Sequence, residues 1–252
     1  MLLHILLHKN AKGVVIITEL KCNSLFDTDK SVAGKYIERF EFPWEAVLGL
    51  SEFIRGLIAL YKKDGRYILL SENVLVAKNA SIANDTLILP PCFIDENAEI
   101  RKGAFIRPGV IIGKQCVVGN SCEIKNSVLF DSAKVPHFNY VGDSILGYGA
   151  HLGAGVITSN VKCDKSEIRI KYKNMHVPTG MKKLGALIGD FSEIGCGSVL
   201  NPGSVVGRNT VVYPLTSLRG FLPEGHICKR DGAYTLKRQY ATSSHPKGRD
   251  LI

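Results

Sequence analysis

The chain has 252 residues, of which 45% are hydrophobic, and it carries a formal net charge of +9. This length suits one large domain, or a small domain beside a larger one, in a globular protein. No apolar run is long enough to span a membrane, and the opening MLLHILLHKN is too short for a signal peptide, so we expect a cytoplasmic protein.

The first 75 residues predict a small α/β cap. Gly13–Leu20 and Tyr67–Leu70 are apolar runs typical of strands. Between them, Pro43 opens a segment with apolar residues at helical spacing, and Asp64-Gly65 ends it. We expect this cap to lie over one end of the domain that follows and to shield its open strand edge.

From residue 82 onward the sequence repeats every six residues. A mostly aliphatic residue recurs at this spacing, and a small or medium residue follows four positions later. The recurring residues are Ile82, Ile88, Ile94, Ile100, Ile106, Ile112, Val118 and Ile124, then Leu146, Leu152 and Thr158 in a shifted phase, then Ile188, Ile194, Leu200, Val206, Val212 and Leu218. A period of six fits neither an amphipathic helix nor an alternating strand. It predicts a parallel β-helix, in which three hexads make one triangular coil.

The fold class is therefore mainly β: a parallel β-helix of hexapeptide repeats with a small N-terminal α/β cap. We assign residues 1–75 to the cap, 76–225 to the β-helix with an inserted loop at 162–187, and 226–252 to a basic C-terminal tail. A short helix is expected over Gly232–Gln239 in that tail. The hexapeptide pattern resembles that of left-handed β-helices, which are rare exceptions to the right-handed crossover rule.

The seven cysteines include no CxxC pair, so we expect neither a zinc site nor disulfides. Cys92, Cys116 and Cys122 occupy the small position of the repeat and are predicted to fill the core. Much of the basic excess lies in Lys162–Lys183 and in the tail after His226. Because these residues lie on neither an aromatic-studded sheet nor a recognition helix, no nucleic-acid partner is expected. The Lys162–Lys183 segment is either a solvated loop or a flexible cationic arm over a phosphate-binding cleft.

The stretch from Val135 to Gly155 breaks the hexad rhythm. It places His137, Asn139 and Tyr140 together, ahead of Gly142-Asp143. A histidine can accept a proton from an amine or hydroxyl group that attacks a carbonyl carbon. The alternative is an ordinary exposed histidine on the surface.

The segment PHFNYVGDSILGYGAHLGAGVITSN, together with the phrase KLGALIG at Lys183–Gly189, resembles the acetyltransferase half of a known family. This is the bifunctional glucosamine-1-phosphate acetyltransferase / N-acetylglucosamine-1-phosphate uridyltransferase family, among the sugar-phosphate nucleotidylyltransferases. The resemblance spans about residues 82–225. It implies a left-handed β-helix and a homotrimer with sites between the β-helices. It also implies metal-independent transfer of an acyl group from acetyl-CoA, as co-substrate, to the amine of a phosphorylated or nucleotide-linked amino sugar.

Transferred residue by residue, the resemblance implies that His137 is the general base and that Asn160 lies beside the reacting amine. The implied sugar-phosphate contacts are Arg107, Lys125, Tyr140 and, more loosely, Lys165, and the implied acetyl-CoA contacts are Gly153, Ala154, Cys196 and Pro214. Backbone N–H groups near Gly153–Gly155 or Cys196 are expected to stabilise the oxyanion. His151 stands where the family has a substrate-binding asparagine, so the acceptor sugar can differ from glucosamine 1-phosphate.

Other functions stay open at this stage. Residues 1–75 lack the Gly-rich, Arg-containing phosphate loop of the uridyltransferase half, so nucleotidyl transfer is not expected. His151 and the unusual cap favour an alternative, a non-catalytic protein of the same fold that binds a sugar nucleotide or CoA. A metal enzyme of the carbonic-anhydrase kind would need three converging histidines, and His137, His151 and His176 lack the required spacing.

Overall fold

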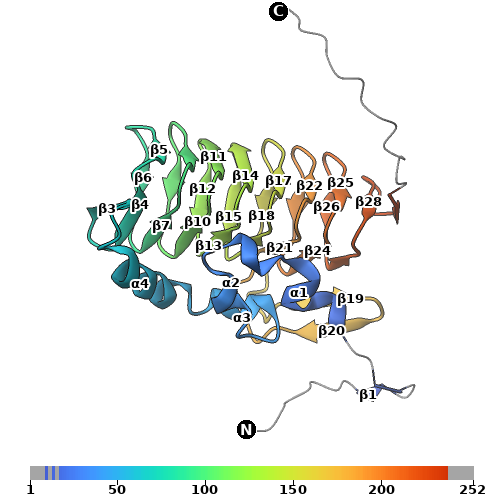
Figure 1. The fold of residues 1–252 in the computed structure, drawn as a ribbon. Coiled ribbons are helices and arrows are strands. Elements are labelled where there is room, and N and C mark those ends of the chain that lie inside the picture. Colours follow the sequence, from blue (N-terminus) through green and yellow to red (C-terminus); the bar gives the residue numbers. More distant parts are fainter. Residues whose placement is uncertain (1–8, 11–12, 15–16, 238–252) are drawn as a thin grey trace, which may run out of the picture.

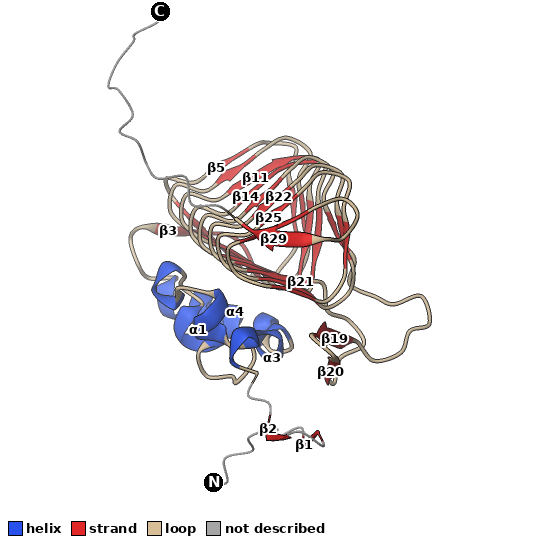
Figure 2. Cartoon of the chain, turned by 90° about the vertical axis from the view of Figure 1, so that its right-hand side faces the viewer, coloured by secondary structure: helices blue, strands red, loops and turns tan. Residues whose placement is uncertain are grey.

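The computed structural model describes residues 9–10, 13–14 and 17–237, and most of them form a stack of triangular coils. Figure 1 shows the stack from the side, and Figure 2 shows it turned by 90°. The predicted left-handed parallel β-helix of hexapeptide repeats is confirmed. In these described ranges, no helix is long and apolar enough to cross a membrane.

Three sheets form the walls of the β-helix, and we number them 1 to 3. Sheet 1 has the strand order β27-β24-β21-β16-β13-β10-β7-β4-β3, sheet 2 the order β29-β28-β25-β22-β17-β14-β11-β8-β5, and sheet 3 the order β26-β23-β18-β15-β12-β9-β6. The strands of sheet 1 are β3 (Tyr67–Ser71), β4 (Val74–Ala77), β7 (Cys92–Ile94), β10 (Val110–Ile112), β13 (Ser127–Leu129), β16 (Ile145–Leu146), β21 (Ala186–Ile188), β24 (Ser204–Val206) and β27 (Phe221–Leu222). Those of sheet 2 are β5 (Ser81–Ile82), β8 (Glu99–Ile100), β11 (Val117–Asn120), β14 (Lys134–His137), β17 (His151–Leu152), β22 (Glu193–Ile194), β25 (Val211–Val212), β28 (His226–Cys228) and β29 (Tyr234–Leu236). Those of sheet 3 are β6 (Leu87–Ile88), β9 (Phe105–Ile106), β12 (Glu123–Lys125), β15 (Tyr140–Gly142), β18 (Ile157–Thr158), β23 (Val199–Leu200) and β26 (Ser217–Leu218).

The recurring residue of each hexad points into the β-helix, as predicted. From Ile94 to Ile124, and again from Ile188 to Leu218, these side chains are buried in one continuous interior cluster. The phase shift has a simple origin. After Ile124 the next interior residue is Leu129, five positions on, and after Val141 it is Leu146, again five positions on. Two short repeats therefore flank the stretch that contains His137, and the coils continue through it.

Hydroxyl side chains join neighbouring coils in the second half of the β-helix. Ser192 Oγ donates to the carbonyl of Gly207 at 2.7 Å, and Thr210 Oγ1 donates to that of Pro223 at 2.9 Å. Both side chains are fully buried. Each bond satisfies a buried polar group at a corner where only a small side chain fits.

Short helices precede the β-helix. They are the 3-10 helices η1 (Thr18–Leu20) and η2 (Thr28–Lys30), and the α-helices α1 (Cys22–Leu25), α2 (Gly34–Ile37), α3 (Pro43–Val47) and α4 (Leu50–Tyr61). The predicted helix after Pro43 is thus split at residues 48–49. The strand predicted over Gly13–Leu20 is wrong at its end, because Thr18–Leu20 is helical. Gly13–Val14 forms the strand β2, which pairs with β1 (Lys9–Asn10). Residues 15–16 lie outside the described residues. Tyr67–Leu70 is a strand, as expected.

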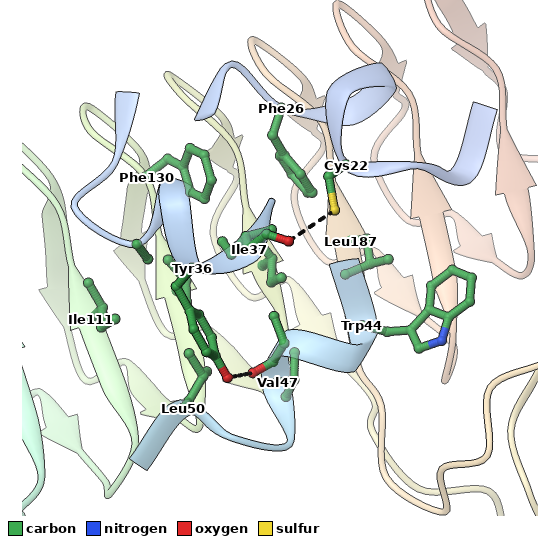
Figure 3. Close-up of a cluster of buried hydrophobic side chains, with 14 of the residues drawn as sticks. Cys22, Phe26, Tyr36, Ile37, Trp44, Val47, Leu50, Ile111, Phe130 and Leu187 are labelled. Carbon is green, nitrogen blue, oxygen red and sulfur yellow. Dashed lines mark hydrogen bonds between the residues drawn. The ribbon is translucent and has the colours of Figure 1, made fainter. Parts of the chain in front are cut away.

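The helices lie along a flank of the β-helix, so the expected position over one end is wrong (Figures 1 and 2). The reason is visible in sheet 1, whose outward side chains are also apolar. Ile111, Phe130 and Leu187 are fully buried beneath the helices, in one cluster with Phe26 and Trp44 (Figure 3). A two-sided apolar sheet must be covered by another layer, and the helices supply it.

The inserted segment covers the rest of this flank. It forms an antiparallel hairpin of β19 (Arg169–Tyr172) and β20 (Met175–Pro178). Ile170 and Tyr172 are buried, and the Tyr172 hydroxyl donates to Glu19 from the helical region, which Lys173 also contacts at 2.7 Å. Residues 169–178 are therefore a docked hairpin, in contrast to the freely moving arm that we considered.

The C-terminal segment also differs from the expectation. The helix predicted over Gly232–Gln239 is wrong for Tyr234–Leu236, which form β29 and pair with β28 in antiparallel fashion. Residues 238 and 239 lie outside the described residues. The division of the chain at residues 75 and 225 stays a prediction.

Steric pressure between coils can be tested at Gly119. A Cβ there would lie 1.4 Å from the backbone oxygen of Pro136 in the next coil, so Gly119→Ala should destabilise the protein by about 1–3 kcal/mol or more. Gly56 of α4 is the matched control, because its Cβ position has no neighbour within 4 Å beyond the adjacent residues and backbone of its own helix, and alanine favours helix by about 1 kcal/mol. Urea unfolding measures both variants. Equal stability of the two would contradict the coil packing.

Candidate functional site

The corner between sheets 2 and 3 carries one column of the predicted residues. His137 ends β14 at this corner. The N–H of Gly155, one coil further on, donates to the carbonyl of His137 at 2.9 Å, and the N–H of Gly197 donates to the carbonyl of Ala154 at 2.8 Å. The next coil adds Leu215, whose N–H donates to the carbonyl of Cys196 at 2.9 Å. His137, Ala154, Cys196 and Pro214 thus follow one another along a single edge.

A buried asparagine holds His137 at this corner. Asn139 Oδ1 accepts a hydrogen bond from the backbone N–H of His137 at 3.0 Å, and its Nδ2 donates to the carbonyl of Gly153 at 2.8 Å. The side chain of Asn139 is buried, whereas His137 is exposed. Asn139 therefore fixes the backbone that presents the His137 ring to solvent. The sequence placed Asn139 in the cluster without giving it this role.

The backbone amides near His137 separate into engaged and free groups. The N–H groups of Gly153 and Gly155 donate to the carbonyls of Ile194 and His137, at 2.7 and 2.9 Å. They are therefore unavailable as oxyanion donors, contrary to our expectation for those two residues. Within residues 17–237, the N–H of Cys196 has no such partner, and it lies 2.7 Å from the position a Cβ would take on Gly153. The N–H of Ala154 likewise has no backbone partner among the described residues, so Ala154 and Cys196 supply the free donors at this corner.

Sheet 3 carries the predicted phosphate contacts on its outer face. The Arg107 guanidinium forms an ion pair with Glu123 at 2.8 Å, and Lys125 Nζ lies 3.7 Å from Asp143. Tyr140 lies over Gly142, because the position of a Cβ on Gly142 falls 2.5 Å from the Tyr140 hydroxyl and 3.0 Å from Asn160 Nδ2. Glycine at 142 thus leaves the space in which Tyr140 and Asn160 meet.

Asp143 is a central residue that our sequence analysis missed. Its buried carboxylate accepts hydrogen bonds from Nδ2 of Asn126, at 2.7 Å, and from Nδ2 of Asn160, and it attracts Lys125. Its φ of 49° is unusual for a residue with a side chain and costs backbone strain. A Gly-Asp step was visible in the sequence, but only the stacking of three coils reveals that Asn126, Asp143 and Asn160 share one corner.

The two groups of predicted residues lie at opposite edges of sheet 3. His137 lies before β15, at one corner. Asp143 lies after β15, at the other corner, where Asn160 of the next coil bonds to it. About 10 Å of strand therefore separates His137 from Asp143 and Asn160. One chain therefore does not bring His137 and Asn160 together. His151 lies in β17 of sheet 2, where its Nδ1 contacts Glu193 Oε2 at 2.7 Å, and Lys165 is an exposed turn residue of the insertion. Neither joins the two groups.

A cavity of about 260 Å³ opens directly beyond Asn160. Its lining residues are Ser159, Val161, Lys162, Cys163, Asp164, Asn201, Pro202 and Arg219. Within the described ranges Lys162 pairs with Asp164 at 3.5 Å, and Arg219 has no carboxylate partner. The cavity thus continues the polar corner of Asp143 with a cation suited to an anionic group. No three acidic, cysteine or histidine side chains of residues 17–237 gather as a metal site would require.

The stacked hexads define a hexapeptide-repeat β-helix protein. Residues 88–221 match the family model described as the GMPPB C-terminal domain, which is more than half of the chain. The chain belongs to this family.

Curated relatives confirm the resemblance inferred from the motifs. A bifunctional sugar-1-phosphate nucleotidylyltransferase/acetyltransferase of Sulfurisphaera tokodaii is 32% identical over 108 residues, which is 43% of this chain and 24% of the relative. The bifunctional protein GlmU of Methanococcus maripaludis is 32% identical over 114 residues, or 45% of this chain and 28% of the relative. The chain thus matches about a quarter of the length of these relatives.

Solved structures with similarity to this chain include acyltransferases. PerB of Caulobacter crescentus, in complex with CoA and GDP-perosamine, has 15% identity and a TM-score of 0.33, and the match covers 72% of this chain and 63% of PerB. The acetyltransferase domain of PglB from Neisseria gonorrhoeae, in complex with acetyl coenzyme A, has 16% identity and a TM-score of 0.25, with 73% and 65% covered. Similarities this low assign neither a ligand nor an activity to this chain.

The electrostatics of the Asp143 corner can be measured through Tyr140. Burial raises the pKa of the Tyr140 phenol above its usual value, and the negative charges of Asp143 and Glu123 raise it further, while Arg107 and the hydrogen bond with Asn160 act in the opposite direction. Asp143→Asn removes one negative charge, so it should lower the Tyr140 pKa. The phenolate absorbance of each protein, minus that of its Tyr140→Phe counterpart, isolates this ring.

The matched control is Asp164→Asn, which removes an exposed acid of the insertion and should leave the Tyr140 pKa unchanged. Circular dichroism recorded across the titration checks that the fold survives. An Asp143→Asn protein with an unshifted Tyr140 pKa would show that the carboxylate does not act on the ring.

Proposed function

We propose that this protein is an acyltransferase that moves an acetyl group from acetyl-CoA to the amine of a phosphorylated or nucleotide-linked amino sugar. The observation that carries the proposal is the column at the corner of sheets 2 and 3, where an exposed His137 lies one coil from Ala154 and two coils from the free N–H of Cys196. Membership of the GMPPB C-terminal domain family, and relatives named as acetyltransferases, support it.

The chemistry requires a base and an oxyanion donor. The amine nitrogen attacks the thioester carbonyl, and His137 accepts the proton that the nitrogen loses. The carbonyl oxygen becomes an oxyanion, to which the N–H of Cys196 donates. The C–S bond then breaks, the new C–N bond remains as an amide, and the CoA thiolate leaves with a proton returned by His137. Neither a metal nor a redox partner is needed.

The acceptor is held by the polar face of sheet 3. Arg107 and Lys125 supply cations, and the hydroxyl of Tyr140 and the amide of Asn160 supply neutral donors. Because Glu123 and Asp143 already pair with the two cations, an incoming phosphate must displace or share these ion pairs. Arg219, in the adjoining cavity, offers a cation with which no carboxylate of the described residues competes. We place the phosphate or diphosphate of the acceptor along this line.

We propose that the working form is a homotrimer with sites between neighbouring β-helices. In one chain, His137 and Asn160 lie at opposite edges of sheet 3, so a neighbouring copy is needed to complete the site. Apolar side chains are exposed near the His137 corner: Phe138 is 61% exposed, Tyr213 45% and Leu215 60%. Exposed apolar side chains that gather along one edge are typical of an interface. We place this enzyme in the cytoplasm, together with acetyl-CoA.

The activity is tested with purified protein, acetyl-CoA and a panel of amino-sugar phosphates and nucleotide-linked amino sugars, with release of the CoA thiol as the readout. His137→Ala should lower kcat by about 10²–10⁴ with little change in KM, because it removes the base alone. His176→Ala is the control, since this exposed histidine lies in the hairpin. Binding of acetyl-CoA without turnover of any acceptor would favour the non-catalytic alternative.

Site sharing between copies is tested by mixing variants. His137→Ala and Asn160→Ala proteins should each be inactive. Trimers formed after co-expression should recover about a quarter of the wild-type activity, because one site in four then has both residues intact. Light scattering gives the mass in parallel. A monomer, or mixed trimers as inactive as either parent, would contradict the shared site.

A further inference from the structure

One row of residues at the corner between sheets 2 and 3 has a backbone conformation that favours glycine. The residues of this row directly follow those of the His137 column, and from the second onward each N–H donates to a carbonyl of the preceding coil. Their φ values lie between 52° and 71°, and they are Gly103, Ser121, Phe138, Gly155, Gly197 and Leu215. Glycine adopts this conformation without strain, whereas a bulky side chain is strained in it. Phe138 and Leu215 are therefore the two exceptional residues of the row.

Burial does not offset the strain at these two residues, because Phe138 is 61% exposed and Leu215 is 60% exposed. Strained backbone of this kind clusters at active sites and ligand clamps. Phe138 directly follows His137, and the centroids of the two rings lie 6.5 Å apart. The strain thus holds an exposed aromatic ring beside the proposed base, where a bound acyl group would meet it.

The side chains of Phe138 and Leu215 lie on either side of the free backbone amides. Along the corner, the coil of Phe138 is followed by those of Ala154, Cys196 and Leu215. A Cβ on Gly197 would lie 2.8 Å from Leu215 Cδ2, so the Leu215 side chain leans over the coil of Cys196. Apart from its chain neighbours, a Cβ on Gly155 would meet no side chain within 4 Å. Bare backbone therefore separates the two bulky side chains.

We propose that Phe138 determines the size of the acyl group that the site accepts, and that its ring restricts the site to acetyl and similarly short groups. This inference rests on the proposed acyl transfer. In the tetrahedral intermediate the oxyanion lies at the free N–H groups of this corner, and the attacking nitrogen lies beside His137. The acyl chain and the sulfur take the two remaining directions from the reacting carbon. The acyl chain lies against Phe138, the apolar side chain next to His137, and the sulfur lies toward Leu215.

The position of the base favours Phe138 over Leu215 as the limiting side chain. The nitrogen that His137 deprotonates bonds directly to the reacting carbon, so this carbon lies close to the coil of Phe138. Three coil steps separate the Cα atoms of Phe138 and Leu215, which is about 14 Å. A chain of two to four carbons therefore reaches the Phe138 ring, whereas Leu215 is too distant to limit it.

Binding of acyl-CoA thioesters of increasing chain length tests the proposal without an acceptor sugar. Isothermal titration calorimetry of the full chain gives the Kd of acetyl-CoA, butyryl-CoA and hexanoyl-CoA, and the wild type should bind acetyl-CoA most tightly. Phe138→Gly removes the ring and suits the φ of 53°, so it should raise the affinity for hexanoyl-CoA relative to acetyl-CoA by about tenfold or more. Phe138→Leu should give an intermediate ratio.

Two variants serve as controls for strain and for orientation. Phe191 also has a positive φ, of 56°, and is 54% exposed, but it lies between β21 and β22, where its ring packs against Tyr148. Phe191→Gly and Leu215→Gly should both keep the wild-type ratio of affinities. A wild-type ratio in Phe138→Gly would overturn the proposal. A raised ratio in Leu215→Gly but not in Phe138→Gly would overturn it in favour of the opposite orientation of the thioester.

The same titrations distinguish this inference from the proposed function. Acetyl-CoA that fails to bind the wild type would overturn the proposed acyl transfer and the role of Phe138 together. Acetyl-CoA binding with an unchanged chain-length preference in Phe138→Gly would overturn the role of Phe138 alone. Light scattering checks that the variants keep the mass of the wild type. Phe138→Leu retains an apolar side chain at this edge, so it carries the test if Phe138→Gly alters the assembly.

Discussion

The whole molecule depends on one constraint: each six-residue side of a coil has room for very few side chains in the interior of the β-helix. The interior residue of almost every side is apolar, as from Ile94 to Ile124, and the buried Thr158 is an exception whose hydroxyl is hydrogen-bonded. The corner residue must be small enough for the next coil to stack. Gly119, pressed against Pro136, and Ser192, bonded to Gly207, are two solutions to the same crowding. Everything that distinguishes this protein from a plain coil is therefore carried by the outward side chains and by the insertions.

The outward side chains give each sheet a different character. Sheet 1 is apolar on its outer face and is covered by helices and the hairpin. Sheet 3 carries ion pairs, such as Arg107 with Glu123, and a buried carboxylate at one corner. The edge between sheets 2 and 3 carries His137 beside exposed apolar side chains. A single repeat thus supports three surfaces, because the repeat restricts only the residues that point inward.

The interior could be predicted from the sequence, since hexad spacing reports directly on side-chain direction. The position of the helices along the flank could not be predicted, because the outward apolar residues Ile111, Phe130 and Leu187 lie in or directly after short strands whose interior residues are equally apolar. His137 was recognisable from its motif, but Asp143 was not, since its partners Asn126 and Asn160 are each 17 residues away and become neighbours only when coils stack. The spacing of residues in the sequence reveals the six-residue repeat. It reveals a cluster such as Asn126, Asp143 and Asn160 only when the number of residues in each coil is known.

The layer on sheet 1 has a consequence for the ways in which copies of this chain can meet. A bare triangular β-helix offers three nearly equivalent walls, and lateral association could then use any of them. Here Phe26, Trp44 and the hairpin residue Tyr172 occupy the outside of one wall. The helical region thus removes one of three geometric choices, and it leaves the edge beside His137 between the two uncovered walls. In the proposed trimer, contact between neighbouring β-helices would therefore be limited to sheets 2 and 3 and the edge between them.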